Sequence, residues 1–162
     1  EFEQKKTIAD LAHPLVSRGQ FVFARERGIL WQTRTPFPQL VRITRRGITQ
    51  ERDGKTLLDL SAQREPAIQA ISEALLSLFS ADFSQLESHF RVAAARKDGT
   101  WRIELIPVSS AMRRAFRRIR LEGADSLRHV ELVDTHGDRT ETRFFEVRAE
   151  GELSDAEAQQ LR

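Results

Sequence analysis

The strongest constraint on the fold of this chain is a series of short segments in which apolar and polar residues alternate with a period of two. Such alternation is typical of β-strands that bury one face and expose the other. Glycine-containing turns separate the segments at regular intervals. Two of these turns, Asp53-Gly54 and Asp98-Gly99, are strong signals for two-residue hairpins. The pattern therefore predicts an antiparallel meander.

About nine or ten segments are predicted to be strands. They cover residues 14–24, 28–34, 40–44, 48–52, 55–60, 90–96, 100–106, 116–122, 127–133 and 140–147. So many consecutive antiparallel strands in a small domain tend to curl. Such a sheet either closes into a barrel or stays open, with helices covering its concave face. The sequence thus predicts a mainly β fold with a few helices, in the α+β class.

One stretch, residues 65–80, changes to a helical period. Its apolar positions recur at the spacing of one helix face: Ile68, Ile71, Leu75, Leu78 and Phe79. We expect three polar positions to face water: Ser72, Glu73 and Ser77. A second short helix is expected near residues 83–90. Ser154 with Glu157 forms a capping box, which predicts a short helix close to the end of the chain.

Composition excludes several functional classes. With 162 residues, 40% of them hydrophobic and 31% charged, the chain is predicted to form one folded domain over residues 1–162. The absence of cysteine excludes disulfides, thiolate metal sites and cysteine nucleophiles. The net charge of +2 argues against a strong binder of polyanions. Because residue 1 is Glu and not Met, we expect a processed or trimmed chain from which any signal peptide is already absent.

Several groups of residues follow one another in a distinctive order. They are Pro14-Leu15-Val16-Ser17, Gly19-x-Phe21-x-Phe23, Gly28-Ile29-Leu30-Trp31, Trp101-x-x-x-Leu105-x-Pro107 and Phe116-x-x-Ile119-x-Leu121-x-Gly123. As an ordered set they resemble the LolA-like family, the periplasmic carriers of outer-membrane lipoproteins and their divergent relatives. The resemblance extends over nearly the whole chain. Most of its positions are turn glycines and inward-facing apolar residues, and none is a catalytic signature.

The resemblance implies an unclosed antiparallel half-barrel with a helical lid over an apolar cavity. It further implies a periplasmic carrier, with no catalysis and no cofactor, that holds the acyl chains of a lipoprotein or lipid. Such a carrier receives cargo from an inner-membrane exporter and passes it to an outer-membrane receptor, touching membranes only transiently. We expect it to be a monomer and to bind no nucleic acid.

The resemblance also assigns residues to parts of the site. The cavity is expected to be lined by Leu15, Phe21, Phe23, Leu30, Trp31, Ile43, Trp101, Leu105 and Phe144. The lid is expected to be the helix at 65–80, with Ile71, Leu75, Leu78 and Phe79 facing the barrel. Carriers of this family have an arginine three positions after a strand tryptophan, which ties the barrel to the lid. Arg34 has that spacing from Trp31, although the additional Thr35 precedes Pro36.

The aromatic composition gives the cavity an independent physical basis. The chain has ten Phe, two Trp and no Tyr, so an aromatic cavity would present no phenolic hydroxyl groups to an acyl chain. The alternative is that the same rings fill a closed core. An ordinary amphipathic core helix would likewise show the pattern of the expected lid, so the sequence leaves both interpretations open.

Basic residues near the middle of the second half of the chain form another candidate site. The densest basic cluster is Arg113, Arg114, Arg117, Arg118 and Arg120, which could bind a partner protein or lipid headgroups, or simply be a solvated strand face. The first of these would make the chain a non-catalytic scaffold of a lipid or pigment biosynthesis system. The low net charge and the absence of tyrosine stacking platforms argue against nucleic acid.

The remaining polar clusters are not expected to form metal-binding or catalytic sites. Asp134, His136 and Asp138 have metal-ligand side chains, but their place beside Gly137 favours hairpin chemistry, and no metal is predicted. Ser109-Ser110 with His129 would be the only conceivable start of a hydrolase site. A lipid-processing enzyme therefore remains a third, separate interpretation.

Overall fold

A computed structural model describes residues 1–80, 83–148 and 151–161, without the side chains of residues 66, 67, 78, 80 and 83–85. Its strands are β1 (Phe2–Thr7), β2 (Leu15–Ala24), β3 (Gly28–Thr35), β4 (Gln39–Thr44), β5 (Gly47–Arg52), β6 (Lys55–Ser61), β7 (Phe90–Lys97), β8 (Thr100–Pro107), β9 (Phe116–Gly123), β10 (Leu127–Asp134) and β11 (Arg139–Phe144). Its helices are α1 (Pro66–Ser80), the 3₁₀ helix η1 (Phe83–Ser88), α2 (Ser110–Ala115) and α3 (Asp155–Gln160).

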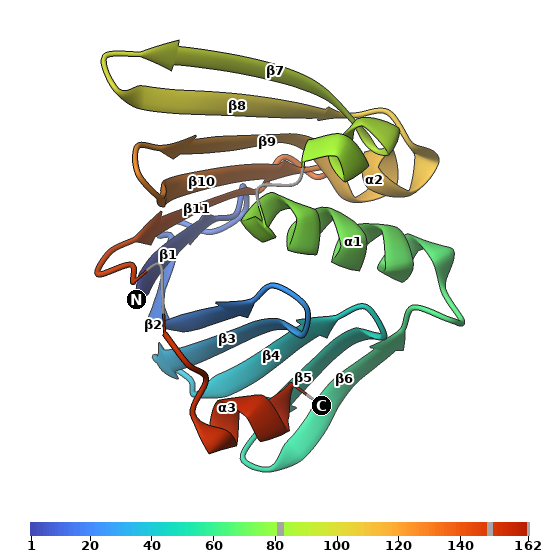
Figure 1. Cartoon of the computed structure of the whole chain (residues 1–162), viewed down its shortest axis with the longest axis vertical. Coiled ribbons are helices and arrows are strands. Elements are labelled where there is room, and N and C mark those ends of the chain that lie inside the picture. Colours follow the sequence, from blue (N-terminus) through green and yellow to red (C-terminus); the bar gives the residue numbers. More distant parts are fainter. Residues whose placement is uncertain (81–82, 149–150, 162) are drawn as a thin grey trace.

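All eleven strands form one antiparallel sheet in the order β6-β5-β4-β3-β2-β1-β11-β10-β9-β8-β7. The first strand pairs with the last, Phe2 opposite Phe144, so both ends of the strand series lie in the middle of the sheet. The sheet curves strongly around α1, but its two edges, β6 and β7, do not meet (Figure 1). The predicted unclosed half-barrel with a helix on its concave side is confirmed.

The predicted strands are present, and two elements were missed. Strand β1 was not predicted because it is short and carries Lys5 and Lys6, so its alternation is weak. Helix α2 was missed because six residues give too few turns to show a helical period. It begins at the N-cap Ser109, whose hydroxyl accepts a hydrogen bond from the Met112 amide.

The arm of the sheet formed by β7 to β10 contains a tightly packed core. Its buried members come from α1, η1, β7, β8, α2 and β9: Ala70, Ala74, Leu86, Phe90, Ile103, Leu105, Met112, Ile119 and Leu121. Trp101 packs against this core and donates a hydrogen bond from Nε1 to the Ala124 carbonyl at 2.8 Å. A Cβ at Gly123 would lie 2.3 Å from the Trp101 ring, so glycine is required for this close approach.

Helix α1 is buried on more sides than the sequence predicted. It lies inside the curve of the sheet and contacts η1 and α2 on one side and β4, β5 and β6 on the other (Figure 1). Ser72 and Ser77, expected to face water, are buried, and only Glu73 of that set is exposed. The prediction was wrong because helical periodicity assumes one buried face, whereas α1 is enclosed by both arms.

Helix α3 is the short helix that the capping box predicted. The Ser154 hydroxyl accepts from the Glu157 amide, and the Glu157 carboxylate accepts from the Ser154 amide. The helix lies against the outer side of the half-barrel, near β4 and β5 (Figure 1). Leu161 just after it is buried.

Candidate functional site

The register of the strands decides which side chains share the concave face. Residues directly opposite each other in a ladder point to the same side of the sheet. Phe21 is opposite Trp31, Phe23 is opposite Ile29, and Ile29 is opposite Ile43. Phe79 of α1 packs on Phe21, so this set faces the helix. The concave face of this arm is therefore apolar and rich in aromatic rings.

Six aromatic side chains form one cluster between this face and α1. Ring centroids are 4.1 Å apart for Phe2 and Trp31, 5.8 Å for Phe21 and Trp31, and 6.0 Å for Trp31 and Phe144. The two longer contacts are edge-on, which is a favoured geometry of aromatic pairs. Strands β1, β2, β3 and β11 supply these rings, because those strands are neighbours in the sheet.

Phe79, near the end of α1, joins the helix to this cluster. Its ring centroid lies 4.6 Å from that of Phe21, 6.0 Å from that of Phe23 and 6.2 Å from that of Phe144. Unlike the packed core of the opposite arm, Phe79 and the rings it contacts are only partly buried. We call the six residues Phe2, Phe21, Phe23, Trp31, Phe79 and Phe144 the aromatic cluster.

The structure brings together part of the predicted cavity set. Phe21, Phe23, Trp31 and Phe144 lie in the aromatic cluster, and Ile43 lies on the same face of the sheet. Sequence reasoning did not assign Phe2 to the cavity. Its alternation with Gln4 could have signalled an inward position, but β1 was not predicted as a strand.

The other predicted cavity residues lie elsewhere. Trp101 and Leu105 belong to the packed core of the opposite arm, and Leu105 is fully buried there. Leu15 begins β2 and is 54% exposed. The assignment of Leu30 to the cavity was wrong. Leu30 precedes Trp31, which faces α1, and successive residues of a strand point to opposite sides, so Leu30 and its partner Arg42 lie on the convex face.

The predicted lid residues divide in a similar way. Ile71 packs against the core of the β7–β10 arm, whereas Phe79 packs in the aromatic cluster. Leu75 is partly buried. The side chain of Leu78 lies outside the described part of the chain. Helix α1 thus contacts both arms of the half-barrel through different residues.

In the part of the chain that the structure describes, Arg34 contacts the sheet and the first residue, and its predicted role of tying the barrel to the lid stays a prediction. Its guanidinium donates a hydrogen bond to the Gln20 side chain and forms an ion pair with Glu1 at 3.5 Å. Gln20 and Arg34 both alternate with residues of the aromatic cluster, so they lie on the convex face, away from α1. Among the described residues of α1, Phe79 packs directly on the aromatic rings of this arm.

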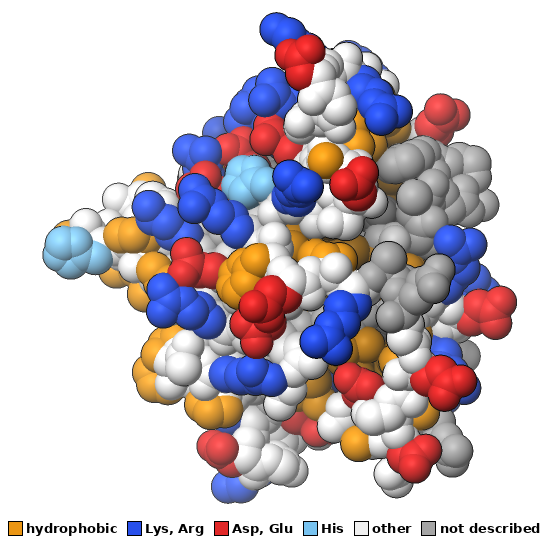
Figure 2. Space-filling view, turned by 60° about the vertical axis from the view of Figure 1, so that its left-hand side comes forward, with side chains coloured by type: hydrophobic (Ala, Val, Ile, Leu, Met, Phe, Trp, Pro, Cys, Tyr) orange, Lys and Arg blue, Asp and Glu red, His pale blue; other side chains and the backbone are white. Residues whose placement is uncertain are grey.

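The predicted arginine surface is divided in the structure. Arg118 and Arg120 form ion pairs with Glu104 and Glu131 on the convex face, with N–O distances from 2.9 to 3.9 Å. Arg117 donates a hydrogen bond to the Thr135 carbonyl. Arg113 and Arg114 are exposed in the last turn of α2. Basic and acidic side chains are also interspersed on the face shown in Figure 2.

The buried carboxylate of Glu131 is the centre of this convex network. Its side chain is 8% exposed and it also pairs with Arg139. Burial by itself raises the pKa of Glu131, but the charge of Arg139, the hydrogen bond from Arg118 and the charges of Arg118 and Arg120 outweigh burial and lower the pKa. Glu131 is therefore a structural anion.

Asp134 stabilises a hairpin turn. Its Oδ1 accepts hydrogen bonds from the backbone amides of His136 at 2.8 Å and Asp138 at 3.0 Å. Asp138 lies 3.7 Å from the ammonium group of Lys6. Within the described residues, no group of His, Asp and Glu side chains is arranged to hold a metal ion.

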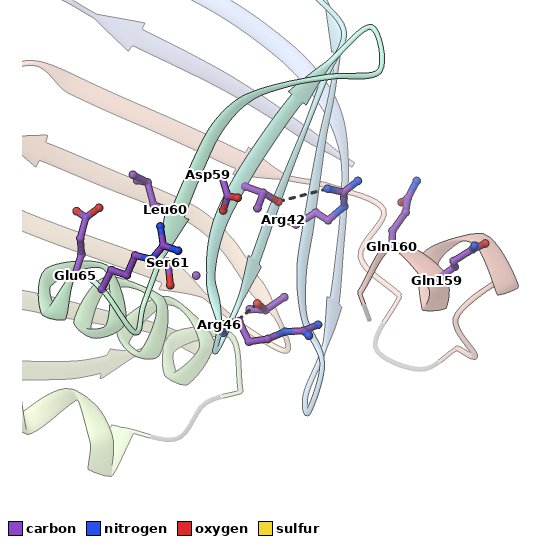
Figure 3. A pocket seen from close by; sticks show the side chains of 12 residues that line it. Arg42, Arg46, Asp59, Leu60, Ser61, Glu65, Gln159 and Gln160 are labelled. Atoms are coloured by element: carbon purple, nitrogen blue, oxygen red, sulfur yellow. Dashed lines mark hydrogen bonds between the residues drawn. The ribbon is translucent and has the colours of Figure 1, made fainter.

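A polar pocket of about 640 Å³ lies on the outer side, between α3 and strands β4 to β6 (Figure 3). Arg42 and Asp59 line it from the strands, Arg46 lines it from the turn between β4 and β5, and Gln159 and Gln160 line it from α3 (Figure 3).

Arg42, the arginine of this pocket that lies within a strand, is paired with a carboxylate. Arg42 donates two hydrogen bonds to the Glu51 carboxylate, at 2.6 and 2.7 Å. The hydrogen bond from Arg42 has the largest effect on Glu51, and together with the arginine charge it lowers the pKa of that carboxyl despite some desolvation. The pocket differs in character from the apolar concave face.

The fold and this face together define a class of protein: a helix-lidded, open half-barrel whose concave side presents a partly buried aromatic surface. No helix in the part of the chain that the structure describes is both long and apolar enough to cross a membrane.

The sequence comparison agrees with this class. The family model described as "Outer membrane lipoprotein carrier protein LolA" matches residues 1–158. The chain belongs to this family. No curated protein matches the chain in a sequence search.

Proposed function

We propose that this protein is a periplasmic carrier that shields acyl chains of a lipoprotein or lipid between the concave face of its sheet and α1. The observation that carries the proposal is the aromatic cluster, in which the lid residue Phe79 contacts three rings of the sheet. Membership of the carrier family supports the same conclusion. The protein would act without catalysis and without a cofactor.

Physical chemistry explains why such a surface suits acyl cargo. Moving an acyl chain from a membrane into water costs about 0.8 kcal/mol for each exposed methylene, so a carrier must offer a comparable apolar surface. The aromatic cluster presents rings without phenolic hydroxyl groups, since the chain has no Tyr. Because these rings already pack against one another, cargo would have to displace Phe79 and move α1.

The proposal includes partners on both sides of the periplasm. An inner-membrane exporter would load the carrier and an outer-membrane receptor would unload it, and the carrier itself would travel as a monomer. The rival proposal, a scaffold acting through the arginine surface, is less well supported. Two of its five arginines, Arg118 and Arg120, already form ion pairs with Glu131 and Glu104 of the same sheet.

A charge in the lid tests the proposal. Leu75→Glu places a carboxylate on α1 where acyl chains are proposed to bind, and we expect acyl affinity to fall at least tenfold, because burying an unpaired charge is costly. The matched control is Val16→Glu, on the convex face and 43% exposed. Binding is measured by titrating a fluorescent fatty acid and a diacylated peptide into each variant.

Two results would contradict the proposal. One is an unchanged acyl affinity in Leu75→Glu with the fold intact by circular dichroism. The other is wild-type protein, purified from a bacterial periplasm, that carries no lipid in native mass spectrometry and also fails to bind added fatty acid or diacylated peptide. In that case charge reversal at Arg113 and Arg114, which are exposed in α2, would test the scaffold proposal.

A further inference from the structure

We propose that β7, at one open edge of the sheet, is a docking strand to which an extended acidic segment of another protein adds by β-strand pairing. This inference is independent of the acyl site, because it concerns the edge of the sheet and not its concave face. Strand β7 pairs only with β8 in the described part of the chain, and it forms the outer edge of one arm (Figure 1).

The hairpin geometry identifies which backbone groups are free. Asp98 and Gly99 both have positive φ, 51° and 76°, as in a two-residue type I′ turn. The residues flanking such a turn, Lys97 and Thr100, form a hydrogen-bonded pair. Because hydrogen-bonded and non-hydrogen-bonded pairs alternate in an antiparallel ladder, the N–H and C=O groups of Val92, Ala94 and Arg96 point away from β8.

The middle of this edge lacks the features that usually prevent strand addition. Natural edge strands are protected by prolines, bulges or charged side chains. The register of β7 with β8 continues without a shift from Phe90 to Lys97. The central segment Val92-Ala93-Ala94-Ala95 has neither proline nor charge. The opposite edge, β6, does have such features: Asp59 in mid-strand and a register shift at its pairing with β5.

Charge indicates the kind of partner. Arg91 lies near one end of β7, and Arg96 and Lys97 lie at the other. All three are exposed, and none forms an ion pair with a residue that the structure describes. A strand with acidic residues at both ends and small or β-branched residues between them is complementary to this edge.

The same charges oppose pairing between two copies of this chain. Antiparallel pairing of β7 with itself around Ala94 would place Arg91 opposite Lys97 on both sides. Like charges directly opposite each other destabilise a strand pair. The occupant that the edge favours is therefore an acidic segment of a different protein.

A short peptide tests the proposal on the full-length chain. The probe is the blocked heptapeptide Glu-Glu-Val-Thr-Val-Thr-Glu, whose antiparallel pairing places its acidic residues opposite Lys97, Arg96 and Arg91. We expect NMR titration to shift the amide signals of Val92, Ala94 and Arg96 most strongly. We expect affinity to fall as salt is raised, because the paired charges are exposed. A peptide with Lys in place of Glu should not bind.

Two pairs of variants separate strand addition from simple charge attraction. Ala94→Pro removes one outward N–H without removing a hydrogen bond to β8, and we expect at least tenfold weaker peptide binding, whereas Ala94→Thr should bind normally. Arg96→Glu with Lys97→Glu leaves the backbone unchanged and should also abolish binding. Its charge-matched control is Arg25→Glu with Arg27→Glu, in the exposed turn after β2.

The outcomes decide the proposal clearly. Shifts confined to β7 and its neighbour, lost in Ala94→Pro and in the Arg96/Lys97 double variant, support it. Equal binding to the acidic and basic peptides would overturn it, as would loss of binding in the Arg25/Arg27 control. Self-association of the wild-type chain in sedimentation experiments, abolished by Ala94→Pro, would assign the edge to a second copy instead and so also overturn it.

Discussion

At the scale of single residues, Glu131 shows how this fold accommodates a buried charge. Its carboxylate accepts a hydrogen bond from Arg118 at 3.1 Å, and Arg120 and Arg139 also pair with it. Removing the Glu131 carboxylate takes one counter-charge from each of these arginines, although Arg118 and Arg120 also pair with Glu104 and Arg139 also pairs with Glu141. Glu131 is therefore expected to matter for stability, although it lies on the side of the sheet opposite the proposed acyl site.

We predict that Glu131→Gln lowers the free energy of unfolding by about 2 kcal/mol at neutral pH, the order of magnitude of hydrogen bonds to a charged group. The folded-state pKa of Glu131 is lowered from 4.5, so its contribution is present above about pH 4.5 and is lost as pH falls through the folded-state pKa. Urea unfolding at pH 7 and pH 3 measures this.

The pH dependence provides the control for that experiment. Wild-type protein should lose more stability than Glu131→Gln between pH 7 and pH 3, because only the wild type has this carboxylate to protonate. Equal losses in the two proteins would show that Glu131 does not contribute through its charge. Acyl binding at neutral pH should be unchanged in the folded variant, since Glu131 lies on the convex face.

At the scale of elements, α1 is held to the aromatic arm by Phe79, and we predict that Phe79→Ala speeds acyl association. Truncation removes ring contacts that favour the closed position of the helix. The truncation therefore lowers the free energy needed to move α1 away from the sheet, a step that must precede cargo binding. Stopped-flow measurement of Trp fluorescence follows binding, because Trp31 belongs to the cluster.

The control for this variant is Phe37→Ala, since Phe37 is 66% exposed in the loop before β4. Its association rate should match that of the wild type. The Phe79 prediction fails if Phe79→Ala binds acyl ligands at the wild-type rate while remaining folded. Some loss of stability is expected in Phe79→Ala, because a partly buried ring is removed.

Elements with a strong local period could be predicted from the sequence, and elements without one could not. The Asp98-Gly99 turn and the alternation in β8 predicted the β7–β8 hairpin, and the capping box predicted α3. The positions of β1 and α2 depend on contacts distant in sequence. Phe2, for example, is buried because β2 and β11 flank its strand.

The concave site could be predicted only in part for the same reason. Alternation within β2 identified Phe21 and Phe23, but it cannot tell which arm of a curved sheet is densely packed. Leu105 and Trp101 have inward positions, yet α2 and η1 fill the space beside them. Arg34 was assigned by spacing from Trp31, whereas its face is decided by strand pairing with β2.

At the scale of the whole molecule, α1 is the element that connects the two arms of an open sheet. It contacts β4, β5 and β6 on one side and η1 and α2 on the other. The two arms are also continuous through the strand pairings in the middle of the sheet, so α1 is the element that bridges them across the concave side. Because α1 covers the aromatic face, the proposed carrier function should depend on the movement of this helix.

A reversible cross-link between lid and sheet tests this dependence. The chain has no cysteine, so Phe79→Cys with Phe21→Cys introduces the only two thiols, at positions whose rings are 4.6 Å apart in the wild type. Treatment with a short, reducible bifunctional thiol reagent should abolish acyl binding, and reduction should restore it. Each single-cysteine variant, treated identically, separates the effect of the cross-link from that of the lost ring. If the cross-linked protein still binds acyl chains with the affinity of its reduced form, cargo enters without displacing α1, and the concave face must be reached from an open edge of the half-barrel.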